Sequence, residues 1–255
     1  MAVPGRRVPE GAPAALADTE LFSVDAYLRE FDATVEEVDR DLGRVALRRT
    51  AFYPGGGGQP HDVGLLRWAD GTATVTKVGR DQGRIWHWLD AGQLPGEGST
   101  VQGELDWERR HLTMRTHTAL HILCGVMWAD HGVAVTGGNM DPGKGRLDFP
   151  LPSMSAEFGR QVEARINEEI ARAHEILVEF VGREAADEDH ALIRTAANLI
   201  PREIDPLRVI DIVGLDKQAD GGTHVLSTAE VGGVRVTGTE SKGKGNKRVR
   251  LEVHD

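Results

Sequence analysis

Two histidines one helical turn apart are the residues of this sequence best suited to holding a metal ion. His117 and His121 lie four positions apart in the segment 117–121, HTALH, and this spacing brings both imidazoles onto one helix face. Such a pair can reach one cation, and a zinc site needs one or two further ligands from elsewhere in the fold. His224, in the glycine-rich segment 220–224, DGGTH, is the natural candidate for the third ligand.

The histidine pair does not predict a peptidase. Zinc proteases carry a glutamate directly after the first histidine as the general base, whereas this chain has Thr118 at that position. The sequence therefore disfavours peptide hydrolysis.

Five segments, in the same order along the chain, resemble the editing domain of alanyl-tRNA synthetases and the free-standing AlaX-type trans-editing proteins. The helix and the later loop resemble the family's H-x-x-x-H and C-G-G-T-H motifs. The other matches are a glycine-rich segment, an R-x-D-F element and a basic ending, at residues 52–60, 146–149 and 241–247. Together the five matches span residues 19–255.

This resemblance implies an aminoacyl-tRNA deacylase, a carboxylic ester hydrolase that acts in trans on mischarged tRNA(Ala) and protects translation fidelity. Ser-tRNA(Ala) and Gly-tRNA(Ala) are the expected substrates, and the sequence does not decide between them. A synthetase pocket built for alanine cannot exclude glycine by size and rejects the serine hydroxyl poorly, so a second hydrolytic site is needed. The expected cofactor is Zn²⁺, and no nucleotide cofactor is required.

The resemblance assigns roles to residues of the two motifs. It places His117, His121 and His224 at the catalytic zinc. The hydroxyl candidates for recognising serine are Thr116, Thr118 and Thr223. Thr223 can instead simply shape its loop. The zinc ion can activate water or polarise the substrate, or it can anchor the substrate amino group, and the sequence leaves these roles open.

Asp220 is where this chain departs from the family pattern, which has cysteine at that position. A carboxylate can ligate zinc directly, as a harder ligand than thiolate. Alternatively, it can hydrogen-bond a ligand histidine or a zinc-bound water. Cys124 lies one turn after His121, but a single helical cysteine between Leu123 and Val126 is more typical of a small buried apolar residue.

The resemblance also implies contacts with the aminoacyl group and the tRNA. Glycine permits close backbone approach, basic side chains neutralise phosphates, and the glycine-rich segment lacks the lysine of a P-loop. Two alternatives stay open, namely a structural Arg146–Asp148 pair and a solvated charged strand near the carboxy terminus. The substrate-binding and tRNA-binding candidates are Gly56, Gly57, Gly58, Gln59, Gly137, Gly138, Arg146, Asp148, Lys242, Lys244 and Lys247.

Two other functions fit the same motifs. A noncatalytic, zinc-containing tRNA-binding module would bind a charged tRNA and protect its ester. A metal-dependent hydrolase of small esters would not need the basic carboxy-terminal run. We expect the stand-alone, medium-sized form of the editing protein, since no class II activation core or ATP-phosphate loop is recognisable.

The composition suits a globular protein of the cytoplasm. The 255 residues include 40% hydrophobic residues and 31 glycines, enough for a core and many tight turns. The net charge of -10 argues against nonspecific coating of nucleic acid. One cysteine excludes an internal disulfide framework and suits a reducing compartment. No apolar run approaches the length of a membrane span, so no membrane association is expected.

The pattern along the chain predicts an α+β protein. Residues 1–18 are expected to form a flexible tail. Short apolar segments separated by turns then predict a small β-barrel over residues 19–106, with hairpins around residues 39–43 and 69–71. An α/β two-layer editing domain with an antiparallel sheet is expected over residues 107–255.

Capping residues mark the helices expected in the second domain. Asp106 can cap a helix that runs into the histidine pair, and Ser155 can cap another. The second helix places apolar residues at i+4 spacing, whereas Glu163, Glu168 and Glu169 are expected in solvent. Strands are expected at residues 176–181, 209–213, 234–237 and 249–253, a further helix at 183–197, and a loop at 215–224.

Overall fold

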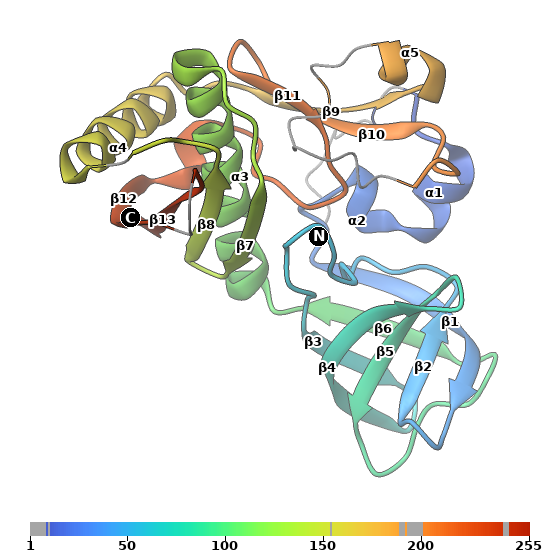
Figure 1. Ribbon diagram of the computed structural model, residues 1–255. Coiled ribbons are helices and arrows are strands. Elements are labelled where there is room, and N and C mark those ends of the chain that lie inside the picture. Colours follow the sequence, from blue (N-terminus) through green and yellow to red (C-terminus); the bar gives the residue numbers. More distant parts are fainter. Residues whose placement is uncertain (1–8, 10, 154, 189–191, 193–200, 242–244) are drawn as a thin grey trace. The chain divides into compact units, whose positions relative to one another are not determined.

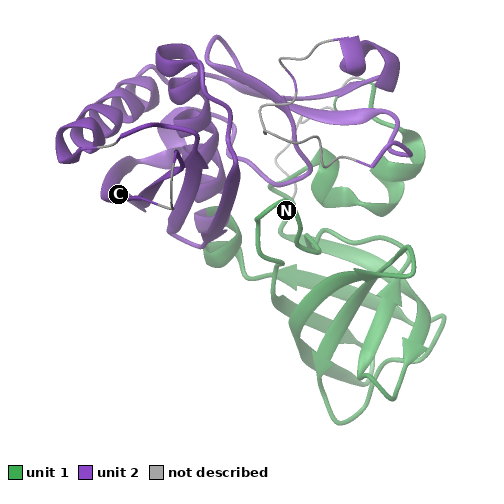
Figure 2. Ribbon diagram, in the orientation of Figure 1, with its two compact units in different colours: residues 1–111 green, residues 112–255 purple. Residues whose placement is uncertain are grey.

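The structure is a computed structural model that describes residues 9, 11–153, 155–188, 192, 201–241 and 245–255. It confirms the predicted α+β class, with an amino-terminal antiparallel barrel followed by helices and antiparallel sheets (Figure 1). The chain divides into two compact units, residues 1–111 and 112–255 (Figure 2). None of the helices in the described ranges has the length and hydropathy that a membrane-spanning segment requires.

Unit 1 contains two short helices and a six-stranded barrel. The helices are α1 (Ala14–Thr19) and α2 (Leu21–Val24). The strands are β1 (Glu30–Asp39), β2 (Arg44–Leu47), β3 (Gly64–Trp68), β4 (Gly71–Asp81), β5 (Arg84–Asp90) and β6 (Thr100–Leu105). They close in the order β1-β2-β5-β4-β3-β6. The two hairpins expected from the sequence are present, β1–β2 and β3–β4.

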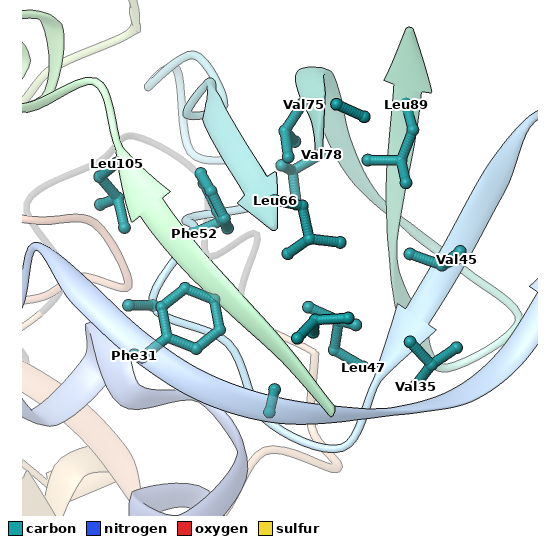
Figure 3. Packing of buried hydrophobic residues seen from close by; sticks show 14 of the residues in the cluster. Phe31, Val35, Val45, Leu47, Phe52, Leu66, Val75, Val78, Leu89 and Leu105 are labelled. Atoms are coloured by element: carbon teal, nitrogen blue, oxygen red, sulfur yellow. The ribbon is translucent and has the colours of Figure 1, made fainter. Parts of the chain in front are cut away.

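The barrel encloses a core of alternating inward-facing side chains. Along β1, every second residue from Phe31 to Val35 is buried, as the period of two of a strand requires. Phe31 and Phe52 meet edge to face, with ring centroids 5.6 Å apart, and aliphatic residues of the other strands fill the remaining space (Figure 3). Gly103 is necessary because a Cβ there would lie 2.3 Å from the Phe31 ring.

His87 of β5 is a fully buried histidine in the barrel. Its Nδ1 lies 3.3 Å from the Val45 carbonyl oxygen and its Nε2 lies 2.9 Å from the Thr50 hydroxyl. Burial lowers the pKa of His87 to about 4, against a smaller opposing effect of the hydrogen bond with Val45. The neutral imidazole therefore donates from Nδ1 to Val45 and accepts at Nε2 from Thr50.

This histidine is expected to make the barrel acid-sensitive. Above the unfolded-state pKa of about 6.5, His87 is neutral in both states, so it adds nothing to the pH dependence of stability. As the pH falls from about 6.5 towards 4, the unfolded chain binds a proton that the folded barrel excludes, so stability is lost. At pH 5 the loss relative to pH 7 is about 2 kcal/mol. Urea unfolding of the parent, of His87→Phe and of the exposed-site control His254→Gln measures it. An equal pH dependence in the parent and in His87→Phe would contradict the assignment.

Unit 2 is built on one long helix and two antiparallel sheets. Helix α3 (Trp107–His131) begins in unit 1 and continues into unit 2. The four-stranded sheet has the order β12-β13-β8-β7, and the three-stranded sheet has the order β11-β10-β9. The strands are β7 (Gly137–Asp141), β8 (Lys144–Phe149), β9 (Ile176–Val181), β10 (Leu207–Ile212), β11 (Asp216–Ala219), β12 (Gly233–Ser241) and β13 (Lys247–His254).

Glycines let α3 pack closely against both sheets. A Cβ at Gly145 of β8 would lie 2.8 Å from Leu120, and a Cβ at Gly125 of α3 would lie 3.0 Å from Asp216 of β11. The face of α3 that carries the histidine pair is thereby fixed against β11. Asp106 caps this helix as expected, since its carboxylate accepts from the Arg109 N–H at 3.1 Å.

Helix α4 (Ala156–Ala171) covers the edge strand β12. Ser155 caps it by accepting from the Phe158 N–H at 3.0 Å, as predicted. The Asn167 side chain hydrogen-bonds both the N–H and the C=O of Val234, which satisfies backbone groups that an edge strand leaves open. The short helix α5 (Arg183–Glu188) and the 3₁₀ helix η2 (Thr228–Val231) complete the described elements. Most of the helix expected beyond α5 lies outside the described residues.

The expected solvation of Glu169 is wrong. Glu169 is only 2% exposed, and its carboxylate lies within 3.1 Å of side-chain nitrogens of Arg165, Arg172 and His174. Burial raises the pKa of Glu169, but the hydrogen bonds with His174 and Arg165 outweigh it and leave the pKa below its usual value. A buried carboxylate needs such partners, and the local sequence pattern of the helix does not reveal them.

Candidate metal centre

The long helix and one loop of unit 2 bring four potential metal ligands together. His117 and His121 lie one turn apart on α3, and both are buried. Strands β10 and β11 form a hairpin that leads into the loop of Asp220 and His224. One donor atom from each of these four residues lies within 4.8 Å of the donor atoms of the other three.

The side chains face one another closely enough for a single cation. His117 Nε2 lies 3.6 Å from Asp220 Oδ1, and His224 Nε2 lies 3.2 Å from Asp220 Oδ2. The His117 and His224 rings are stacked with centroids 4.2 Å apart, and the His121 ring stands across both. A tetrahedral zinc with bonds of about 2.1 Å separates its ligand atoms by roughly 3.4 Å. Three imidazoles and one carboxylate in this arrangement fit that ion.

Hydrogen bonds hold the ligand loop in shape. Asp220 Oδ2 accepts from the Gly222 N–H at 2.7 Å, the side-chain-to-backbone bond of an Asx turn. The buried Arg208 of β10 donates from one guanidinium nitrogen to the carbonyls of Asp220 and Gly222, at 2.9 and 2.8 Å. Because Asp220 Oδ2 is engaged with the backbone, Oδ1 is the oxygen turned towards His117.

Each histidine is also contacted on the side away from the cluster. Thr118 Oγ1 lies 3.1 Å from His224 Nδ1 and also accepts from the Val225 N–H at 3.4 Å. The backbone of Thr223 hydrogen-bonds His117. Gln218 Nε2 lies 3.2 Å from His121 Nδ1. Such partners hold imidazole rings in a fixed orientation.

The electrostatics favour neutral imidazoles beside an ionised carboxylate. Burial lowers the pKa of His117 to about 4, although the Asp220 charge opposes this shift. Burial and the neighbouring His117 and His121 hold the pKa of His224 well below its usual value. Burial opposes ionisation of Asp220, but His117, His224 and His121 outweigh it and keep the pKa of this carboxyl well below its usual range. Neutral imidazole and carboxylate are the protonation states that ligate metals.

All three candidate threonines are buried, and the hydroxyls of Thr116 and Thr118 make hydrogen bonds within the fold. Thr118 is fully buried behind His224, and Thr223 is fully buried within the loop. Thr116 donates its hydroxyl to the Leu112 carbonyl at 2.7 Å and accepts from the Gly143 N–H at 2.9 Å. The Thr118 hydroxyl therefore lies where it can orient a ligand histidine.

The glycine-rich candidates belong to unit 1, where residues 55–59 form a tight turn. Gly56 and Gln59 exchange two backbone hydrogen bonds, at 3.1 and 2.9 Å. Gly55, Gly56, Gly57 and Gly58 all have positive φ, from 58° to 132°, conformations that side chains other than glycine rarely adopt. The Tyr53 hydroxyl donates to the Gly56 carbonyl at 3.1 Å.

The remaining candidates lie on the four-stranded sheet of unit 2. Gly137 and Gly138 of β7 pair with Asp148 and Leu147 of β8. Asp148 accepts two hydrogen bonds from Arg248 at 2.7 Å, whereas Arg146 Nη1 lies 3.8 Å from Asp148 Oδ2.

The basic carboxy-terminal run is partly neutralised within this sheet. Arg250 pairs with Glu240 at 2.7 Å, and Arg248 pairs with Asp148. Lys247 is 8% exposed and donates to the Ser241 hydroxyl at 3.2 Å. Lys242 and Lys244 lie outside the described residues.

Sequence reasoning missed three side chains that support the centre. Arg208 holds the loop, whereas Asp216 and Gln218 contact His121 from β11. The segment 215–224 was expected to be a loop, and that expectation is wrong for residues 216–219, which form a strand. The buried positions of this strand are Asp216 and Gln218, so the apolar alternation that marks a half-buried strand is absent.

Comparison with known proteins gives two family matches. Residues 19–109 match the family described as tRNA synthetases class II (A). Residues 207–250, which contain Asp220 and His224, match the family described as threonyl and alanyl tRNA synthetase second additional domain.

Relatives that match over most of this chain are alanyl-tRNA editing proteins and alanine–tRNA ligases. The alanyl-tRNA editing protein AlaX-M of Methanosarcina acetivorans is 37% identical over 242 residues, which cover 92% of this chain and 98% of that protein. AlaX-M of Saccharolobus solfataricus is also 37% identical, over 236 residues, with the same coverage of both chains. The alanine–tRNA ligase of Pyrococcus furiosus is 34% identical over 238 residues, which cover 92% of this chain and 26% of the ligase.

Proposed function

Because this chain belongs to the AlaX-M family of alanyl-tRNA editing proteins, we propose that it hydrolyses the aminoacyl ester of mischarged tRNA(Ala) in trans. The proposed substrates are Ser-tRNA(Ala) and Gly-tRNA(Ala). The observation that carries the proposal is the buried cluster of His117, His121, Asp220 and His224. These residues come from the two segments in which the chain resembles the editing motifs.

The proposed reaction transfers the aminoacyl group to water. Water adds to the ester carbonyl, the bond to the ribose oxygen breaks, and that oxygen leaves with a proton as the terminal hydroxyl of the tRNA. An aminoacyl ester is already activated, so the site needs mainly to orient water and stabilise charge on the carbonyl oxygen. A Zn²⁺ ion bound by the cluster would supply Lewis-acid polarisation for this purpose.

The residues of the chain have distinct parts in this proposal. His117, His121 and His224 would offer ring nitrogens to the ion. Thr118 and the Thr223 backbone hold two of these rings from behind. Asp220 supplies the only negative charge among the four clustered residues. The low pKa values of His117 and His224 make them donors to a cation rather than acids at neutral pH.

The tRNA-binding part of the proposal rests on backbone access and on charge. We propose that residues 56–59, Gly137, Gly138 and Arg146 approach the acceptor end, since glycines expose the backbone and Arg146 keeps 30% of its side chain exposed. Asp148 is proposed to act indirectly, by holding Arg248. Lys242, Lys244 and Lys247 remain predicted phosphate contacts.

Turnover of charged tRNA tests the function. The purified protein is incubated with Ser-tRNA(Ala), Gly-tRNA(Ala) and correctly charged Ala-tRNA(Ala). We expect loss of the serine or glycine ester and survival of the alanine ester. A tRNA-capture module would instead bind the charged tRNA and slow its spontaneous hydrolysis. A hydrolase of small esters would cleave an aminoacyl ester lacking the tRNA as fast as the full substrate.

Substitutions at Asp220 test whether it ligates the metal. If Asp220 is a ligand, Asp220→Ala is expected to lose zinc affinity and deacylation together. Asp220→Cys supplies a softer thiolate and is expected to retain zinc and part of the activity. The control is Asp211→Ala, on the same hairpin but paired with Lys217 at 3.6 Å. Loss of metal from a folded Asp220→Cys protein would contradict direct ligation, as would full metal retention by Asp220→Ala.

A further inference from the structure

Asp216 is a buried carboxylate beside the metal centre that the proposed reaction does not use. It is the first residue of β11, and its side chain is fully buried. A Cβ at Gly125 would lie 3.0 Å from Asp216 Cβ. Gly125 follows His121 by one helical turn, so its missing side chain lets β11 bring the carboxylate close to that histidine.

The contacts of Asp216 point to His121. Asp216 Oδ2 lies 3.6 Å from His121 Nδ1 and accepts a short hydrogen bond from the Gln218 amide nitrogen. That amide nitrogen lies 3.2 Å from the same Nδ1. Because Nδ1 faces this pair, Nε2 is the nitrogen that His121 can offer to the cluster.

Ligation through Nε2 requires the proton of a neutral imidazole to reside on Nδ1. An amide nitrogen cannot accept that proton in a hydrogen bond, whereas a carboxylate oxygen can. Exchanging the positions of the Gln218 amide oxygen and nitrogen would place that oxygen beside Asp216 Oδ2, where two acceptors would repel each other. The carboxylate therefore also fixes the orientation of the amide. Of the two side chains behind Nδ1, Asp216 is therefore the one whose facing atom can accept this proton, whereas the Gln218 amide nitrogen is a donor that holds the carboxylate in place.

We propose that Asp216 is a positioning residue that holds His121 in its Nδ1-protonated, Nε2-ligating tautomer, with Gln218 bracing the carboxylate. A carboxylate behind a ligand histidine orients the ring and raises its basicity towards the metal. The inference rests on the metal centre of the proposed function, but it does not depend on hydrolysis.

Zinc affinity and the His121 Nδ1–H resonance test the inference together. Asp216→Asn is nearly isosteric but removes the carboxylate charge, and zinc affinity is expected to fall about 10- to 100-fold. In the zinc-loaded parent, the Nδ1–H proton of His121, assigned from its absence in His121→Gln, is expected to be protected from exchange. Asp216→Asn is expected to shift that resonance and accelerate its exchange.

Two further variants separate this role from general damage. Asp211→Asn removes a partly exposed carboxylate of the same hairpin and is expected to leave zinc affinity and the resonance unchanged. Gln218→Met keeps the carboxylate, so we expect a smaller loss of affinity and a retained Nδ1–H signal. Parental zinc affinity and an unshifted resonance in Asp216→Asn would overturn the inference. A larger loss of zinc affinity in Gln218→Met than in Asp216→Asn would also overturn the inference. Failure of the parent to bind zinc would instead reject the metal centre, and zinc binding without deacylation would reject only the proposed reaction.

Discussion

Replacing His117 with alanine is expected to lower zinc affinity by on the order of a hundredfold or more, because a site of this kind distributes its binding energy over only three or four ligands. The substitution removes the nitrogen that lies 3.6 Å from Asp220 Oδ1. Metal analysis of the purified parent should find close to one equivalent of zinc, and His117→Ala should retain far less. Deacylation of mischarged tRNA(Ala) should fall with the metal content.

The matched control for this variant is His131→Ala. His131 is an exposed histidine in the last turn of the same helix, where its ring lies against Phe158. We expect the control to keep its zinc and its deacylase activity. One full equivalent of tightly held zinc in His117→Ala would contradict the proposed ligand set.

The second large effect is expected at Arg110, a fully buried arginine at the start of α3. Its guanidinium hydrogen-bonds the Asp62 carboxylate and the carbonyls of Ala26 and Ala51. Arg110→Met leaves the buried carboxylate without this charge, and we expect the free energy of unfolding of unit 1 to fall by about 3–5 kcal/mol. Denaturant unfolding followed by the fluorescence of the barrel tryptophans measures the loss.

Two variants test the cause of that loss. Arg109→Met removes the neighbouring arginine, whose side chain donates a 3.3 Å hydrogen bond to the His61 carbonyl, and should change stability by less than about 1 kcal/mol. Adding Asp62→Asn to Arg110→Met removes the uncompensated charge and should restore part of the stability. If the double variant recovers no stability, the loss in Arg110→Met comes mainly from lost packing and not from the unpaired Asp62 charge.

Arg110 also connects the core of unit 1 to the glycine-rich turn. Asp62 accepts from the Tyr53 N–H, and its own N–H donates to the Tyr53 carbonyl at 3.0 Å. These hydrogen bonds join the two ends of the segment 53–62, which contains the glycines of the turn. The ion pair therefore fixes both ends of the turn that we propose to approach the tRNA.

The parts of the fold that follow from local patterns could be predicted from the sequence. Strand alternation and turn residues indicated the barrel, and Asp106 and Ser155 marked the starts of two helices. These signals are local because capping and pleating depend on neighbouring residues. The i, i+4 histidines likewise needed only helical geometry to be placed on one face.

The parts that depend on long-range polar contacts could not be predicted in this way. Strand β11 carries Asp216 and Gln218 where an apolar pattern would place valines or leucines, because those positions face His121. Glu169 is buried because arginines and a histidine surround its carboxylate in the fold. Arg110 gives no sequence signal, since its partners lie 48 to 84 residues away along the chain.

The most direct test of the central claim, that the four-residue cluster is a metal-dependent deacylation site, is single-turnover hydrolysis before and after metal removal. The substrate is whichever of Ser-tRNA(Ala) and Gly-tRNA(Ala) the parent hydrolyses faster. We predict that chelation lowers the rate by on the order of a hundredfold and that added zinc restores it in the parent but not in His117→Ala. A metal-free protein that hydrolyses the ester at the zinc-loaded rate would contradict the account.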